Sequence, residues 1–218
     1  MGEDYHLVSY SESEERANRL THGFATLLSL LGSIILIIAA SRTDDPYRIV
    51  SCAIYSSILC LFYFISTLYH SVRDHQVRYV FRILDHAGIY VVIAGTYTPI
   101  TLISLRAGHG WALFGTVWGL AVVGVIFKSF MTHKLAILAP VFYIALGWLI
   151  VVDVKELLAL IPFAGVVWLI AGGLSYTFGI VFYALERIPF NHAIWHLFVI
   201  AGSLCHYLAI LWYVVPLA

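Results

Sequence analysis

Seven long apolar runs alternate with short polar breaks along the chain. Each run is close to the ~20 residues that an α-helix needs to cross the hydrocarbon core of a bilayer. The runs cover about residues 20–40, 48–70, 83–105, 111–130, 135–152, 162–185 and 192–215. The fifth run differs from the others because it is short and contains Pro140. The pattern predicts an all-α integral membrane protein, a seven-transmembrane helix bundle that forms a single domain over residues 1–218.

The first 19 residues are polar and precede the first apolar run. A cleavable signal peptide starts basic and becomes apolar at once, whereas this segment starts acidic. We therefore expect the segment to be retained. It is predicted to form a short helix at the membrane interface, with Ser13 as its N-cap.

Composition supports the membrane assignment. Of the 218 residues, 61% are hydrophobic and only 11% are charged, against roughly 25% charged in soluble domains. The formal net charge is zero, so bulk electrostatics indicates no nucleic-acid partner. Cys52, Cys60 and Cys205 lie scattered in apolar runs, so they predict neither a disulfide framework nor a metal site.

Basic residues fall unevenly on the two sides that seven spans define. The side of the N-terminus receives Arg16, Arg19, Arg73, Arg78, Arg82, Lys128, Lys134 and Arg187. The opposite side receives Arg42, Arg48, Arg106 and Lys155. Because cytoplasmic loops carry the excess of Lys and Arg, the distribution predicts a cytoplasmic N-terminus and an outside C-terminus.

Two histidines at the start of the last run, His192 and His196, are four residues apart. On a helix this spacing places both imidazoles on one face, where they could bind one metal ion. In the predicted topology, the end of the second run brings His70 to the same side of the membrane, and the start of the third brings Asp85. A third imidazole would complete a nitrogen set suited to zinc, with one position open for water.

Two further residues would then supply chemistry. Asp85 could act as a general base toward the water, and Ser66, one helical turn before His70, could hydrogen-bond the water or a substrate carbonyl. Zinc lowers the pKa of bound water to about 7, which makes a nucleophile available at neutral pH.

Some of these polar residues also have structural interpretations. A single histidine at a membrane boundary, such as His75, His109 or His133, is usually just interfacial. Asp85 could simply pair with Arg82, three residues earlier on the same helix.

Polar residues nearer the two chain ends also have structural interpretations. Glu14, Glu15 and Asn18 could do no more than solvate an interfacial helix. His206 lies about 15 Å deeper than His196, where an unpaired polar group is costly. It could line a ligand cavity or bond to a neighbouring helix.

Motifs in the chain resemble those of the hemolysin III family, which belongs with the progestin and adipoQ receptors. They are Glu15-x-x-Asn18-x-x-x-His22-Gly23, Ser66-x-x-x-His70, Leu84-Asp85-His86-Ala87-Gly88-Ile89-Tyr90 with Gly95-Thr96-Tyr97-Thr98-Pro99, and Pro189-Phe190-Asn191-His192-Ala193-Ile194-Trp195-His196. The motifs are long and correctly spaced, and the resemblance covers nearly the whole chain.

The resemblance implies seven helices, a cytoplasmic N-terminus and a zinc ion near the cytoplasmic face. By this resemblance, His70, His192 and His196 hold the zinc, Asp85 holds the zinc-bound water, and Ser66 matches the family's serine. The chain lacks the long N-terminal region of the animal receptors, so hormone binding is not carried over. A compact chain of this kind looks bacterial, which suggests the inner (plasma) membrane.

Three functions compete. The first is a zinc-dependent hydrolase that cleaves an amide or ester bond of a membrane lipid and serves membrane homeostasis; the alkaline ceramidases look similar in their Ser, Asp and His arrangement. The second is a lipid sensor with structural zinc. The third is a pore-forming cytolysin, which would need polar stripes along several helices that the sequence lacks.

Overall fold

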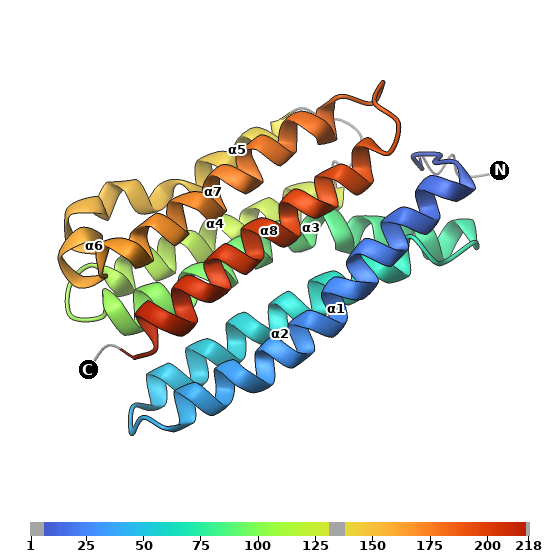
Figure 1. Cartoon of the computed structure of the whole chain (residues 1–218). Coiled ribbons are helices and arrows are strands. Elements are labelled where there is room, and N and C mark those ends of the chain that lie inside the picture. Colours follow the sequence, from blue (N-terminus) through green and yellow to red (C-terminus); the bar gives the residue numbers. More distant parts are fainter. Residues whose placement is uncertain (1–6, 131–137, 217–218) are drawn as a thin grey trace.

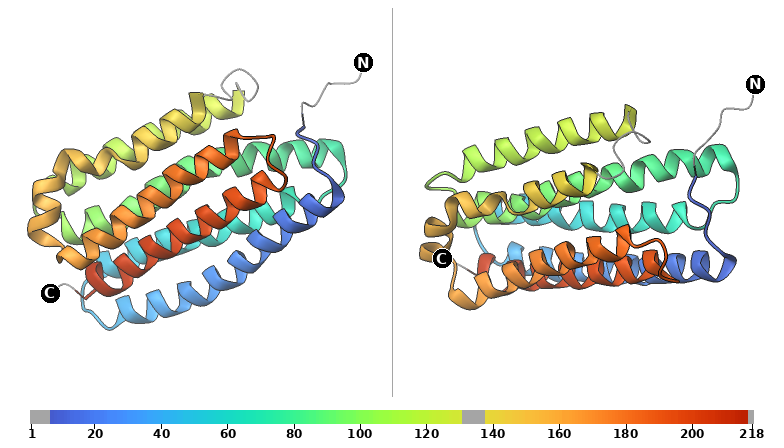
Figure 2. Two further views of the ribbon diagram at one scale, coloured as in Figure 1. Left: turned by 45° about the horizontal axis from the view of Figure 1, so that its top comes forward. Right: turned by 90° about the horizontal axis from the view of Figure 1, so that it is seen from above.

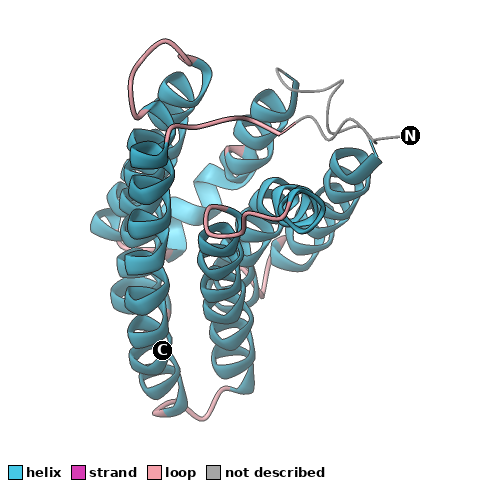
Figure 3. Ribbon diagram, turned by 90° about the vertical axis from the view of Figure 1, so that its right-hand side faces the viewer, coloured by secondary structure: helices cyan, strands magenta, loops and turns pink. Residues whose placement is uncertain are grey.

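The computed structural model describes residues 7–130 and 138–216, and within these residues it consists of helices joined by short loops, without strands (Figure 3). The helices are α1 (Glu12–Ser41), α2 (Pro46–Tyr69), α3 (His75–Pro99), η1 (Ile100–Ser104), α4 (Gly110–Phe130), α5 (Leu138–Gly147), η2 (Leu149–Asp153), α6 (Val154–Leu160), α7 (Phe163–Ala184), α8 (Asn191–Ala209) and η3 (Ile210–Val214).

The long helices form a closed bundle. Helices α1 to α4 pack in chain order, α7 packs against α8, and α8 returns to α1. Helix α5 contacts α3, α4 and α7, which closes the ring. The start of α1 and the end of η3 lie at opposite ends of the bundle (Figure 1). Seen from above, α4 lies on one side, with α1, α7 and α8 on the other (Figure 2).

Six helical stretches among the described residues are long and apolar enough to cross a membrane. They correspond to the predicted runs other than the fifth, and large apolar side chains on α1 such as Leu27 and Leu31 are exposed, as expected beside lipid. Within the fifth run, the described residues form α5, of 10 residues, followed by η2. Residues 131–137, which include the start of that run, lie outside the described residues.

The prediction of a separate interfacial helix capped by Ser13 is wrong. Helix α1 begins at Glu12 and runs without a break through the first apolar run, for 30 residues. Its N-cap is Ser11, whose hydroxyl accepts from the backbone N–H of Glu14, while the Glu14 carboxylate accepts from the backbone N–H of Ser11. This reciprocal capping box satisfies two backbone donors and fixes the start of the helix.

Glycines allow the close packing of α7 on α8. Gly165, Gly172 and Gly179 are spaced by seven residues, so they lie near one face of α7. A Cβ at Gly172 would lie 2.3 Å from Nδ1 of His206 and 3.0 Å from the carbonyl oxygen of Gly202. Small residues at such an interface bring two membrane helices into close contact.

Candidate metal centre

Three histidines meet at the end of the bundle where α1 and α8 begin and α2 ends. His70 is the C-cap of α2, and His192 and His196 lie in the first turns of α8. One possible ligand atom from each lies within 4.8 Å of the other two. All three side chains are buried, with exposed fractions of 4%, 5% and 1%. The structure thus brings together three imidazoles that the sequence places in two distant segments.

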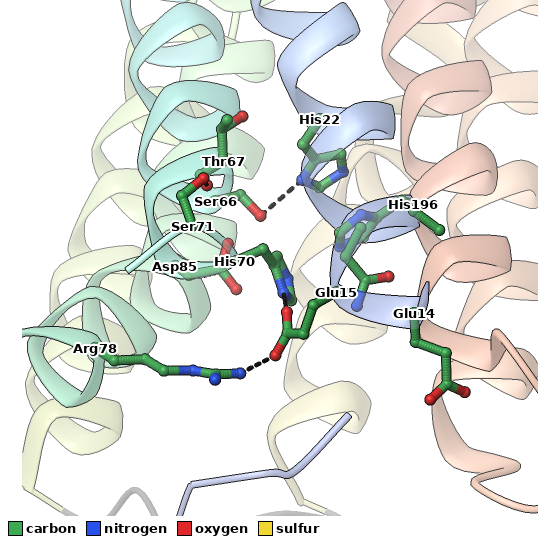
Figure 4. Close-up of polar contacts among 12 residues, drawn as sticks. Glu14, Glu15, His22, Ser66, Thr67, His70, Ser71, Arg78, Asp85 and His196 are labelled. Atoms are coloured by element: carbon green, nitrogen blue, oxygen red, sulfur yellow. Dashed lines mark hydrogen bonds and ion pairs between the residues drawn. The ribbon is translucent and has the colours of Figure 1, made fainter. Parts of the chain in front are cut away.

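Helix α1 fixes the orientation of the His70 ring. Nδ1 of His70 lies 2.8 Å from Oε2 of Glu15, whose other carboxylate oxygen pairs with Arg78 (Figure 4). Because an ionised carboxylate only accepts hydrogen bonds, Nδ1 of His70 carries the proton. Nε2 of His70 is therefore the lone-pair nitrogen, and it is buried without a partner.

Thr21 acts on His196 in the same way. Its hydroxyl donates to the backbone carbonyls of Ala17 and Asn18, at 3.0 and 2.9 Å. Nδ1 of His196 lies 3.0 Å from the same hydroxyl oxygen, so the imidazole N–H is the donor. Nε2 of His196 then keeps its lone pair.

This donor set fits a zinc ion. His70 and His196 each have Nδ1 engaged by a hydrogen bond, which is the usual arrangement of a histidine that binds metal through Nε2. Nε2 of His192 is also buried without a partner. Three neutral imidazoles on rigid helix ends match the ligands of open zinc sites.

Asp85 and Ser66 lie beside the histidines. The Asp85 carboxylate, on α3, faces Ser66 and His70 (Figure 4). Oγ of Ser66 also lies 2.7 Å from Nδ1 of His22. The His22 ring stacks on His196 with centroids 3.5 Å apart. The predicted Asp85 and Ser66 are therefore grouped with the histidines, and so is His22.

His206 lies apart from this group. Its Nδ1 is 2.9 Å from the carbonyl oxygen of Gly202 on its own helix, and its ring stacks against Tyr176 at 5.5 Å. It lines an apolar cavity between α3, α5, α7 and α8. His206 therefore lines a cavity, as one of the two alternatives had it. Its hydrogen bond is made within α8 and not to a neighbouring helix.

His109 lies at the opposite end of the bundle. Its side chain is exposed, and its Nδ1 lies 3.1 Å from Oδ1 of Asp153 and 3.5 Å from Oε2 of Glu156. The three could together hold a cation, but they also make an ordinary surface ion pair. His133 lies outside the described residues, and His75 is exposed at the start of α3.

Sequence reasoning missed Tyr10, Thr21 and Arg78. The Tyr10 ring lies 5.2 Å from the His192 ring and 6.0 Å from the His70 ring, although Tyr10 precedes α1. Burial raises the pKa of its phenol, which therefore stays protonated. Helical spacing could have pointed to Thr21, three positions after Asn18, but no sequence signal marks a residue outside the helices such as Tyr10.

A cavity of about 560 Å³ adjoins the histidines. Tyr10, Glu14 and His192 line its polar end, and Val141, Ile144 and Ile180 line its apolar side. Ile144 and Ile180 also line the apolar cavity that contains His206. The polar side chains of the histidine cluster and the apolar cavity therefore lie next to each other.

Residues 10–207 match the haemolysin-III related family. The chain is 44% identical to "Hemolysin-3" of Bacillus cereus, with 94% of each chain covered. It is 40% identical to "Hemolysin-3 homolog" of Bacillus subtilis (strain 168), covering 94% of this chain and 97% of that one. The human "Monocyte to macrophage differentiation factor" is 32% identical, covering 90% of this chain and 83% of that one. No solved structure matches significantly.

These matches cover nearly all of the described helices and every residue of the histidine cluster. The predicted family is confirmed: the chain is a multi-pass membrane protein that belongs to the haemolysin-III related family.

Proposed function

We propose that this protein binds one zinc ion through His70, His192 and His196 and hydrolyses an amide or ester bond of a membrane lipid. The observation that carries the proposal is the convergence of three buried imidazoles beside the Asp85 carboxylate. A buried cluster of ionisable groups in a membrane protein is costly, so it indicates function.

The same proposal includes seven membrane crossings with the N-terminus in the cytoplasm. Helix α5 runs alongside α7 (Figure 1), so that α5 with η2 is suited to be the crossing between α4 and α7. The basic-residue distribution then supports a position of the histidines near the cytoplasmic face. Relatives in two Bacillus species favour the plasma membrane of a bacterium as the location.

The chain's own residues divide the chemical work. Zinc, when bound, would polarise a carbonyl group and make water more acidic. Asp85 is positioned to take a proton from that water and to pass it to the leaving amine or alcohol. Ser66 orients Asp85, while Glu15 and Thr21 hold two of the imidazoles in the tautomer that binds metal.

The cavities support a lipid substrate. The larger one meets the histidine cluster at His192, and the two cavities share apolar lining residues. A headgroup linkage could lie at the polar end while an acyl chain occupies the apolar part.

The test is a comparison of Asp85→Asn with wild type and with a matched control. Asp85→Asn should keep about one zinc per chain and the same melting temperature, but lose roughly 10²–10⁴-fold in lipid hydrolysis, the usual effect of removing a general base. His196→Ala should lose the zinc itself. His75→Ala, exposed at the same end of the bundle, should change neither readout.

A lipid sensor with structural zinc is the second candidate. It is favoured by the hydrogen bonds through which α1 connects α2 and α8: Glu15 contacts His70, and Thr21 contacts His196. In that case wild type would hold zinc yet show no hydrolysis above Asp85→Asn on any lipid, and His196→Ala would mainly loosen the bundle. Pore formation has less support, because the polar cluster lies at one end of the bundle.

A further inference from the structure

One face of α1 runs along the histidine cluster. Glu15, Asn18 and His22 are spaced i, i+3 and i+7, so they lie on the same side of the helix. Glu15 contacts His70 one turn before Asn18, and His22 contacts Ser66 one turn after it. Asn18 therefore lies between two residues that both face the cluster.

Asn18 has no internal hydrogen-bond partner for its side chain. It is 0% exposed, yet neither its Nδ2 nor its Oδ1 makes a hydrogen bond in the described part of the protein. Nε2 of His22 is likewise buried without a partner. A buried polar atom left unsatisfied is unfavourable for folding, so each such group needs an explanation.

Stability does not supply that explanation. A leucine of nearly the same size would fill the Asn18 position without an unpaired amide. Three unpaired polar atoms one helical turn apart on the same side of α1 match a polar group that comes from outside the fold. Nδ2 of Asn18 offers donors, whereas Nε2 of His22 offers an acceptor when its Nδ1–H donates to Ser66.

We propose that Asn18 and His22 form a polar subsite that binds the carbonyl group of the substrate. The Asn18 amide donates to the carbonyl oxygen, and Nε2 of His22 accepts from a hydrogen on the neighbouring atom of the substrate or on a water. This inference rests on the proposed hydrolysis. It assigns to Asn18 the stabilisation of the carbonyl oxygen as negative charge develops on it.

The chemistry is balanced without a further reactant. As water adds to the carbonyl carbon, a C–O bond forms and the C=O electron pair moves onto the oxygen that Asn18 contacts. The C=O bond then re-forms as the bond to the amine or alcohol breaks, and the leaving group takes the proton held by Asp85. A donor aimed at that oxygen stabilises it most when its charge is greatest.

Asn18→Leu tests the subsite, and Ser29→Ala is its control. Ser29 is buried on the same side of α1, three turns further on, but its hydroxyl is bonded within its own helix at 2.8 Å. Decanohydroxamic acid serves as the probe, because it carries a carbonyl group and an N–H on a metal-binding headgroup. Zinc content, melting temperature, probe affinity and lipid hydrolysis are measured for each zinc-loaded protein.

Asn18→Leu should keep the zinc and melt at the wild-type temperature or higher. It should bind the probe about tenfold more weakly, as expected for one lost hydrogen bond, and hydrolyse lipid roughly 10²–10³-fold more slowly. Ser29→Ala should bind and hydrolyse as wild type does.

The outcomes separate the two proposals. Lost zinc or a lower melting temperature in Asn18→Leu would make Asn18 structural and overturn the subsite, as would wild-type probe affinity. Weakened probe binding in a protein that hydrolyses no lipid would retain the subsite and reject the hydrolase. Full lipid hydrolysis by Asn18→Leu would reject the subsite and retain the hydrolase. A wild-type protein that binds neither zinc nor the probe would reject both the subsite and the hydrolase.

Discussion

Glu15 contacts a candidate metal ligand and a cation at the same time. One carboxylate oxygen accepts from His70, and the other pairs with Arg78. A carboxylate bonded to the far nitrogen of a metal-binding histidine fixes the ring and raises its basicity. In the proposed metal site, Glu15 would therefore act through His70, as a positioning residue.

Glu15→Gln should weaken zinc affinity by about 10–100-fold, because it removes the charge that holds the His70 tautomer. The measurement is zinc competition against a chelator of known affinity, at constant pH. Glu12→Gln, exposed in the same helical turn, is the matched control and should bind zinc as wild type does. Equal zinc affinity in both variants would mean that Glu15 only solvates the start of the helix.

The site could be predicted from sequence only in part. The spacing of His192 and His196 and the boundary position of His70 pointed to the cluster that the structure contains. The role of Glu15 was left open, because a carboxylate on an interfacial helix and one that orients an imidazole look alike in sequence. Its contact with His70 spans 55 residues and depends on how α1 packs on α2.

At the scale of elements, α7 and α8 pack as closely as their glycines allow. The Cβ position at Gly172 is blocked by the His206 ring, which a hydrogen bond to Gly202 holds in place. A Cβ at Gly115 on α4 would meet nothing within 4 Å. The two glycines therefore have opposite tolerance for a methyl group.

Gly172→Ala should lower the free energy of unfolding by about 1–3 kcal/mol, the usual cost of overpacking. Gly115→Ala should be neutral or slightly stabilising, since alanine favours a helix over glycine. Thermal unfolding in detergent measures both. An unchanged melting temperature for Gly172→Ala would mean that His206 moves aside at little cost.

Hydropathy predicted the helices better than their ends. Helix α1 starts at Glu12 and α3 at His75, both before the predicted runs, because the capping side chains of Ser11 and Asp74 begin helices within polar sequence. The described part of the fifth run is α5 followed by a 3₁₀ turn, since an apolar run reports burial in lipid and not regular hydrogen bonding.

At the scale of the whole molecule, the two chain ends test the topology. An alkaline phosphatase fusion, active only outside the cytoplasm, should be active after Ala218 and silent after His75. The reason is the excess of Lys and Arg on the side of the N-terminus. The reverse pattern would mean that the protein has the opposite orientation in the membrane. Activity at both positions would mean that the chain crosses the membrane an even number of times between His75 and Ala218, so the fifth run would not be a crossing as predicted.

The histidine cluster draws its ligands from both halves of the chain, with His70 on α2 and the other two at the start of α8. During synthesis, α1 to α7 enter the membrane first and carry His70 and Asp85, but neither of the other two candidate ligands. The proposed metal could then be held only once the last helix has been made. A chain that stops before α8 would lack two of the three proposed ligands, so binding of the proposed metal would mark a finished molecule.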